Sequence, residues 1–232
     1  MGDGAPALLA RGPWDASQVE VHWRERAFVP DAPATAAADA AVAELRRRGS
    51  PTHDGMSARM VEFDSSARHL RLELEPARWS LRLGRDAGAS ISALCVVRNA
   101  EGRWLAGRRA PWVATWPGRW ALGAGGAVEV GENPADTLLR ELHEEWGVRP
   151  RLLSVEALVR VPSGLILLVG LATLAPGGAR IEMDAEHDAH AWWPPDPADW
   201  PPEAEGQVRR MGALLADADA TSRPPPGARR AR

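Results

Sequence analysis

The chain has 232 residues, of which 45% are hydrophobic and 25% charged, and its net charge at pH 7 is −3. These values are typical of a soluble globular protein with one large domain or two smaller ones, and they give no sign of nucleic-acid binding. The single cysteine, Cys95, excludes an internal disulfide and a multi-cysteine metal site. No apolar run is long enough to span a membrane, and no signal peptide is recognised, so we expect a cytoplasmic protein.

The first 86 residues are predicted to form a small α+β domain. The opening residues, 1–12, look loose, and VEVHW (19–23) alternates like a short strand. Residues 34–48 are Ala-rich and end at Gly49, a pattern typical of a helix. The runs ARMVEF and HLRLEL, separated by DSSAR, predict a hairpin. The composition loosens at residues 84–89, where we place a domain boundary.

Residues 87–218 are predicted to form a second, larger α/β domain. Asn133 and Pro134 favour a helix start, and Gly147 favours its end. A closing amphipathic helix is expected near residues 203–218, followed by a disordered tail at 219–232. The expected strands are ISALCVVR, RWLAGRR, WALGAGGAVEV, RLLSVEALVRV, GLILLVGLATL and ARIEM, and DAEHDAHAWW is read as an acidic loop.

Three glutamates stand close together on the helix that begins at Pro134. At 100° per residue, Glu141, Glu144 and Glu145 form an arc beside the apolar one. Each like-charged pair costs about 0.2–0.5 kcal/mol on an exposed helix, and more where water is excluded. Arg140 can relieve Glu144 but not all three carboxylates, whereas a divalent cation can. A solvated acidic face is the alternative interpretation.

The spacing upstream of these glutamates favours the metal-binding interpretation. Gly126, five residues, Glu132, seven residues and then RELHEEWGV from Arg140 to Val148 form a complete pattern. This pattern resembles the box of the Nudix hydrolase family, and the resemblance extends over residues 90–216. It implies an α/β/α sandwich around a mixed sheet, preceded here by the small α+β domain.

The resemblance also implies a metal site. The family hydrolyses a diphosphate bond that links a nucleoside to another moiety, with Mg²⁺ or Mn²⁺. By motif position, Glu141 and Glu145 are expected to bind the metal directly, Glu144 directly or through water, and Gly125 through its carbonyl oxygen. Glu132 and Arg140 are expected to form a structural pair. Ala124 departs from the family pattern, which usually has proline there.

Members of this family often take a further carboxylate, as ligand or general base, from a loop before a strand that carries tryptophan. Here that loop is DAEHDAHAWW, and Glu186 is our choice, with Asp184 and Asp188 as alternatives. The base can also be Glu141 or Glu144. The histidines His187, His190 and His143 are assigned to packing or to the surface.

Substrate contacts are less well defined by the sequence. Trp112 and Trp116, in a long loop, are candidates for stacking on a base. Arg108 and Arg109, on the strand that leads into this loop, are candidates for binding a terminal phosphate. An ordinary exposed strand face explains the two arginines equally well.

The leading functional hypothesis is a Mg²⁺-dependent pyrophosphohydrolase, for which Mn²⁺ can substitute. Its substrate is a nucleoside diphosphate linked to another moiety, of the ADP-ribose, nucleotide-sugar or dinucleotide type. The alternatives are a nucleoside triphosphate pyrophosphatase and a non-catalytic nucleotide sensor. The expected partner is a small nucleotide, without nucleic acid or membrane, and homodimerisation through the N-terminal domain stays open.

Overall fold

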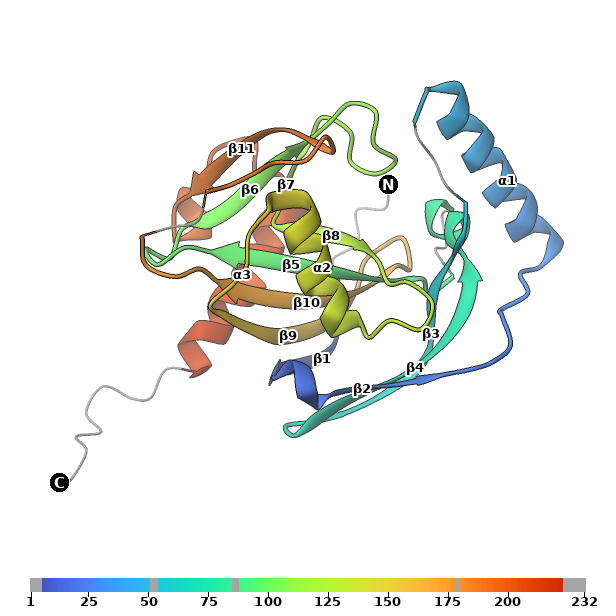
Figure 1. Cartoon of the computed structure of the whole chain (residues 1–232), viewed down its shortest axis with the longest axis horizontal. Coiled ribbons are helices and arrows are strands. Elements are labelled where there is room, and N and C mark those ends of the chain that lie inside the picture. The colour runs from blue at the N-terminus through green and yellow to red at the C-terminus, as the bar shows by residue number, and fades with distance from the viewer. Residues whose placement is uncertain (1–5, 51–53, 85–87, 178–179, 223–232) are drawn as a thin grey trace.

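A large mixed sheet forms the centre of the fold, and a smaller sheet lies beside it (Figure 1). The computed structural model describes residues 6–50, 54–84, 88–177 and 180–222, with side chains up to residue 216. The eight-stranded sheet has the order β1-β9-β10-β5-β6-β11, with β7 paired to β6 and β8 to β5. Within it, β5 and β10 run parallel, and the other paired strands are antiparallel.

The strands of the large sheet are β1 (Ala7–Trp14), β5 (Ile91–Arg98), β6 (Trp104–Arg109), β7 (Trp120–Leu122), β8 (Ala124–Ala127), β9 (Leu152–Arg160), β10 (Ile166–Thr173) and β11 (His187–Trp193). Helix α2 (Pro134–Trp146) covers one face, and α3 (Gly206–Ser222) covers the other. Alternate residues of β5 face opposite ways, as a strand requires: Cys95 packs in the core that contains Leu142 of α2, and Val96 in the core that contains Leu215 of α3. The predicted α/β/α sandwich is therefore confirmed.

The smaller sheet has the order β2-β4-β3 and packs on the α2 side of the large sheet. Its strands are β2 (Val19–Trp23), β3 (Met56–Ser66) and β4 (His69–Arg78). The same part of the chain contains α1 (Ala32–Arg47) and the short 3₁₀ helices η1 (Ala16–Gln18) and η2 (Trp79–Leu83). A third 3₁₀ helix, η3 (Pro197–Asp199), lies further along the chain, before α3. Leu70 and Leu72 of β4 share a buried core with Leu142 of α2. The amide of Ala58 donates a hydrogen bond of 2.8 Å to the carbonyl of Val128, so the backbone of β3 also joins the two parts.

The prediction that residues 1–12 are loose is wrong for the residues described. Residues Ala7–Trp14 form β1, which pairs antiparallel with β9 at one edge of the large sheet. Trp14 is 1% exposed and its indole donates to the carbonyl of Ser66, so burial of this ring holds the strand in place. The segment 1–86 thus contributes a strand to the large sheet as well as forming the small one. The domain boundary at residue 86 stays a proposal.

Two expectations near the C-terminus also need correction. The described residues of ARIEM, 180–183, form no strand, and residues 187–193 of the expected acidic loop form β11. In β11 the paired Trp192 and Trp193 lie opposite Leu105 and Trp104 of β6, and this apolar contact explains why the segment is extended. The tail expected at 219–232 begins inside α3, and residues 223–232 lie outside the described part.

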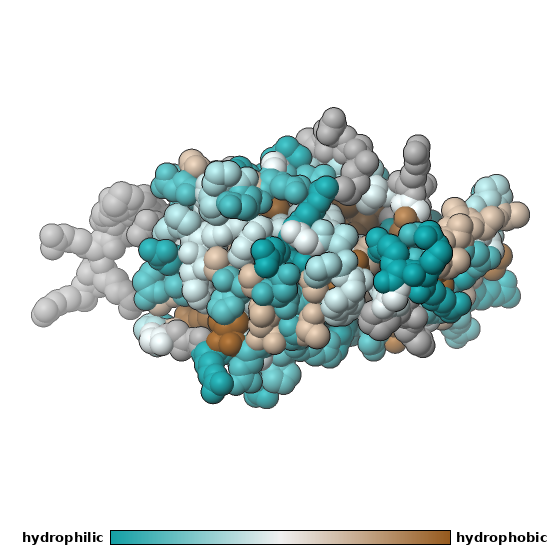
Figure 2. Space-filling view, turned by 90° about the horizontal axis from the view of Figure 1, so that it is seen from above, coloured by the Kyte–Doolittle hydropathy of each residue, from teal (hydrophilic) through white to brown (hydrophobic). Residues whose placement is uncertain are grey.

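Apolar side chains are largely enclosed by this arrangement. The face seen in Figure 2 is mainly hydrophilic, with hydrophobic residues in small separate areas. Among the described residues, no helix combines the length and the apolar character needed to cross a membrane.

Candidate active site

Helix α2 carries the three glutamates, and its ends are well defined. The Asn133 side chain caps the N-terminus by accepting a hydrogen bond from the amide of Ala135, and Pro134 occupies the first turn. Gly147 ends the helix with a φ of 64°, a left-handed conformation that favours glycine. The side-chain amide of Asn133 also donates to the carbonyl of Val19, which ties this end of the helix to β2. The predicted helix bounds are confirmed.

Most of the apolar arc of α2 is buried, although Leu139 is 41% exposed, and the acidic arc lies along its border. Leu138, Leu142 and Trp146 have no exposed surface. Of the glutamates, Glu145 is buried, Glu141 is half-buried and Glu144 is exposed. The helix therefore places its carboxylates in three different environments.

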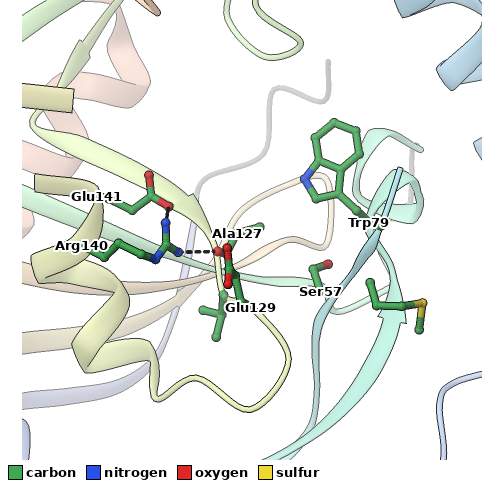
Figure 3. Close-up of a pocket in the computed structure, with 9 residues that line it drawn as sticks. Ser57, Trp79, Ala127, Glu129, Arg140 and Glu141 are labelled. Atoms are coloured by element: carbon green, nitrogen blue, oxygen red, sulfur yellow. Dashed lines mark hydrogen bonds and ion pairs between the residues drawn. The ribbon is translucent and has the colours of Figure 1, made fainter. Parts of the chain in front are cut away.

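Arg140 contacts three glutamates, and Figure 3 shows its contacts with Glu141 and with Ala127. Its guanidinium bonds both carboxylate oxygens of Glu132, at 2.9 and 3.1 Å, and it contacts Glu141 at 2.7 Å and Glu144 at 3.1 Å. It also donates to the carbonyl of Ala127 in β8. Burial opposes the charge of Glu132, but the hydrogen bonds from Arg140, Thr137 and the backbone of Glu129, together with the charge of Arg140, outweigh it and lower the pKa of this carboxyl. The pair predicted to brace the loop against the helix is thus in contact.

Glu145 is the most deeply placed carboxylate, with 4% of its surface exposed. One oxygen accepts a 3.0 Å hydrogen bond from the amide of Gly125. The other, Oε2, has no hydrogen-bond partner among the described residues. Burial raises the pKa of Glu145 well above its usual value; the charge of Arg109 and the amide of Gly125 oppose the shift, and the charges of Glu141 and Glu186 add to it. A buried carboxylate with a free oxygen is costly unless a cation neutralises it.

The environment of the Glu141 carboxyl is similar to that of Glu145. Burial raises its pKa to about 6; Arg140 opposes the shift, and the charges of Glu144 and Glu186 add to it. Glu186 thus acts electrostatically on both Glu141 and Glu145, although it lies more than forty residues further along the chain. The structure therefore brings the predicted fourth carboxylate to the box helix.

Glu186 is positioned by backbone and side-chain contacts at the start of β11. Its carbonyl accepts from the amide of Ala110, its amide donates to Asp184, and its carboxylate pairs with Arg109 at 2.9 Å. Of the alternatives, Asp184 is thus a partner of Glu186, and Asp188 pairs with Arg108 at 2.6 Å. Both arginines predicted to bind phosphate are engaged with carboxylates here.

His187, which the sequence assigns to packing or to the surface, is buried beside the site. Its ring is buried against Trp146, with 4.5 Å between the ring centroids, and lies between Asp184 at 3.2 Å and Glu145 at 3.7 Å. Burial lowers its pKa, which favours the neutral ring. The sequence signal that could have identified it is its position directly after Glu186.

The two tryptophans predicted to stack on a base lie in the loop between β6 and β7. Trp112 is half-buried. Trp116 has a φ of 56° and packs against the core on the α3 side of the sheet. Because Glu145 and Glu141 belong to α2 on the opposite face, Trp116 is directed away from the carboxylates.

The donor set suits a hard divalent cation. Glu141, Glu144 and Glu145 offer carboxylate oxygens, and Gly125, whose amide donates to Glu145, has a backbone carbonyl that can serve as a further ligand. The unpartnered Oε2 of Glu145 is the observation that fits such an ion best. Within the described ranges, no three acidic, imidazole or thiol groups converge as a ready-made metal cluster. Arg140 holds Glu141 and Glu144 in this arrangement, so those two side chains would have to reorient to bind an ion.

A NUDIX domain is matched by residues 89–215, more than half of the chain. The chain belongs to the Nudix hydrolase family. An uncharacterised Nudix hydrolase of Pseudomonas aeruginosa is 46% identical over 55 residues, which are 24% of this chain and 32% of that protein. A MutT-like protein of Streptomyces ambofaciens is 32% identical over 108 residues, 46% of this chain and 65% of that one. The chain thus covers less than two-thirds of the length of either relative.

Among solved structures, a MutT Nudix hydrolase from Burkholderia pseudomallei is similar with a TM-score of 0.45 and 20% identity, over 54% of this chain and 97% of that one. The Nudix match leaves out β1 to β4, α1 and η2.

Proposed function

We propose that this Nudix hydrolase is a pyrophosphohydrolase that uses Mg²⁺, or Mn²⁺ in its place. Its substrate would be a nucleoside diphosphate linked to another moiety, of the ADP-ribose, nucleotide-sugar or dinucleotide type. The observation that carries the proposal is the buried Glu145, whose Oε2 lacks a hydrogen-bond partner in the described part of the chain and has only the His187 ring 3.7 Å away, while Glu141 and Glu186 repel the carboxylate. The single buried thiol is compatible with a cytoplasmic protein.

Each acidic residue has a distinct role in this proposal. Glu145 and Glu141 hold the cation, Glu144 assists, and the carbonyl of Gly125 completes the protein's share of the ligands. When bound, the cation would offset the negative charge of the diphosphate and make a bound water more acidic. Arg140 keeps Glu141 near the glycine-rich strand β8 through its contact with Ala127.

Glu186 is the proposed general base. Its carboxylate is 42% exposed, so water reaches it, and it lies close enough to Glu141 and Glu145 for its charge to raise their pKa values. The ion pair with Arg109 fixes its direction. In this role Glu186 takes a proton from the water that attacks phosphorus, and Glu141 or Glu144 is the alternative base.

The proposal also includes the predicted substrate contacts, which are those of Arg108, Arg109, Trp112 and Trp116. Arg108 and Arg109 can bind a phosphate group of the substrate if that phosphate displaces their ion-pair partners, Asp188 and Glu186. Trp112 is the better placed of the two rings, because Trp116 packs on the α3 side.

The test is a panel of substrates with Mg²⁺ and products identified by mass. The panel contains ADP-ribose, nucleotide sugars, dinucleoside polyphosphates, NADH, coenzyme A and nucleoside triphosphates. A nucleoside monophosphate and a phosphorylated remainder from one linked diphosphate would support the proposal. Release of pyrophosphate from a triphosphate would replace it with the triphosphatase alternative. Binding of nucleotides without any cleavage would contradict it in favour of a sensor.

A further inference from the structure

A cavity of about 240 Å³ lies between the Nudix box and the N-terminal part of the chain (Figure 3). Ala127, Glu129, Arg140 and Glu141 line the side that belongs to the box. Trp79 lines the opposite side, together with residues 55–57. Ligand pockets are commonly about 300–1,000 Å³, so this one suits a single ring system at one end of a larger ligand. Half of the cavity therefore comes from outside the matched Nudix domain.

Trp79 is held firmly on its side of the cavity. It begins η2, and the residue before it, Arg78, forms ion pairs of 2.6 Å with both Asp39 and Asp54. The amide of Ser80 donates to Asp54, and the amide of Trp79 donates to the carbonyl of Gly55. Because these contacts fix the backbone on both sides of the ring, the indole presents a preformed surface to a ligand.

Arg82, three residues further along η2, reaches toward the box. Its guanidinium donates to the hydroxyl of Ser92 in β5, and Ser92 lies opposite Ala127, which lines the cavity. The guanidinium is 5.8 Å from the centre of the Trp79 ring. Burial lowers the pKa of Arg82 to about 10, and the charge of Glu141 opposes this shift. An arginine from the N-terminal part thus stays charged within electrostatic range of Glu141, a proposed metal ligand.

We propose that η2 completes the substrate site: Arg82 binds a phosphate oxygen of the nucleotide, and the Trp79 ring stacks on its base. The inference rests on the proposed function and names the part of the substrate that each residue recognises. A guanidinium is well matched to phosphate oxygens, and an indole accepts any base on its flat face. Ser57 and Glu129 offer polar atoms in the lining of the cavity, where the edge of a base can form hydrogen bonds.

Measurements of equilibrium binding test the contact of Trp79 with the base and that of Arg82 with the phosphate separately. Calorimetry in Mg²⁺ would compare AMP, GMP and UMP with ribose 5-phosphate, which has the sugar and phosphate but no base. The wild-type protein should bind the three nucleotides more tightly. Trp79→Ala should weaken nucleotide binding by about 5- to 150-fold and leave ribose 5-phosphate unchanged, while Trp79→Phe keeps most of the preference. Arg82→Gln should weaken all four ligands by a similar factor, and Arg82→Lys should restore part of it.

The ratio of the two affinities is internally controlled, because partial unfolding of a variant reduces the binding of both ligand types equally. A wild-type protein without preference for nucleotides over ribose 5-phosphate would overturn the inference. The inference would also be overturned if Trp79→Ala kept the preference for nucleotides, or if Trp112→Ala lost it instead. The assay needs no turnover, so absence of hydrolysis would count against the proposed function and not against this site.

Discussion

Gly126 packs directly against the carboxylate of Glu141, and this contact allows a sharp test of the site. A β-carbon built at Gly126 would lie 2.0 Å from Oε1 of Glu141 and 2.3 Å from its carboxyl carbon. Real β-carbons essentially never approach so closely, so Gly126→Ala must displace the Glu141 side chain. Displacement breaks the 2.7 Å ion pair between Glu141 and Arg140.

The expected cost follows from that broken contact. A hydrogen bond to a charged group is worth about 1.5–3 kcal/mol, and this is the most stability that Gly126→Ala should lose, because the atoms in the way are the end of the flexible Glu141 side chain, which can turn aside. For a domain of this size each kcal/mol lowers the melting temperature by about 2–4 °C. Turnover should fall by about 10- to 100-fold or more, because the added methyl group limits where the Glu141 carboxylate can lie when it binds the proposed ion.

A double-mutant cycle on melting temperature measures whether Glu141 is the cause. In a Glu141→Ala background the obstacle is gone, and Gly126→Ala should be neutral or stabilising by up to about 1 kcal/mol, since alanine restricts the unfolded chain. An equal loss of stability in both backgrounds would refute the reasoning and place the strain elsewhere in the backbone.

Three further outcomes are expected. Trp14→Ala should destabilise the fold by about 3–5 kcal/mol in chemical denaturation, because a ring that is 1% exposed anchors β1; a loss below 1 kcal/mol would show that this strand is dispensable. In the metal-free protein, the contribution of Glu141 and Glu145 to the melting temperature should fall as the pH rises from about 4.5 through about 6, against an opposite contribution from His187, whose pKa is lowered by burial. The reason is that folded Glu141 and Glu145, with raised pKa values, keep protons that the unfolded chain has lost, and Glu145→Gln should flatten this slope. Glu186→Gln should lower kcat by about 10²- to 10⁴-fold with little change in KM, whereas a mild effect on kcat would move the base to Glu141 or Glu144.

The parts of the fold that the sequence predicts well are those with local signals. Asn133, Pro134 and Gly147 mark both ends of α2, and the helical spacing places Glu145 nearest the buried face. The strands β5 and β10 are continuous apolar runs, as expected for strands covered on both faces.

The parts that the sequence does not predict depend on distant partners. Ala7–Trp14 has a weak strand pattern, and it becomes β1 because β9 offers an open edge and Trp14 finds a buried place. The same holds for Trp79 and Arg82, which face the box only because Arg78 and Ser80 anchor η2 through Asp54. Nothing in the spacing of these residues connects them to Glu141.

The central claim is that the carboxylates of α2 hold a catalytic cation, and one ratio tests it most directly. On the substrate cleaved best in the panel, the Mg²⁺-dependent kcat of the wild-type protein is compared with that of Glu145→Gln, which keeps the size of the side chain and its bond to the amide of Gly125. We expect the variant to stay folded and to lose at least about 10²-fold in kcat. Turnover within a factor of two of the wild type would contradict the account.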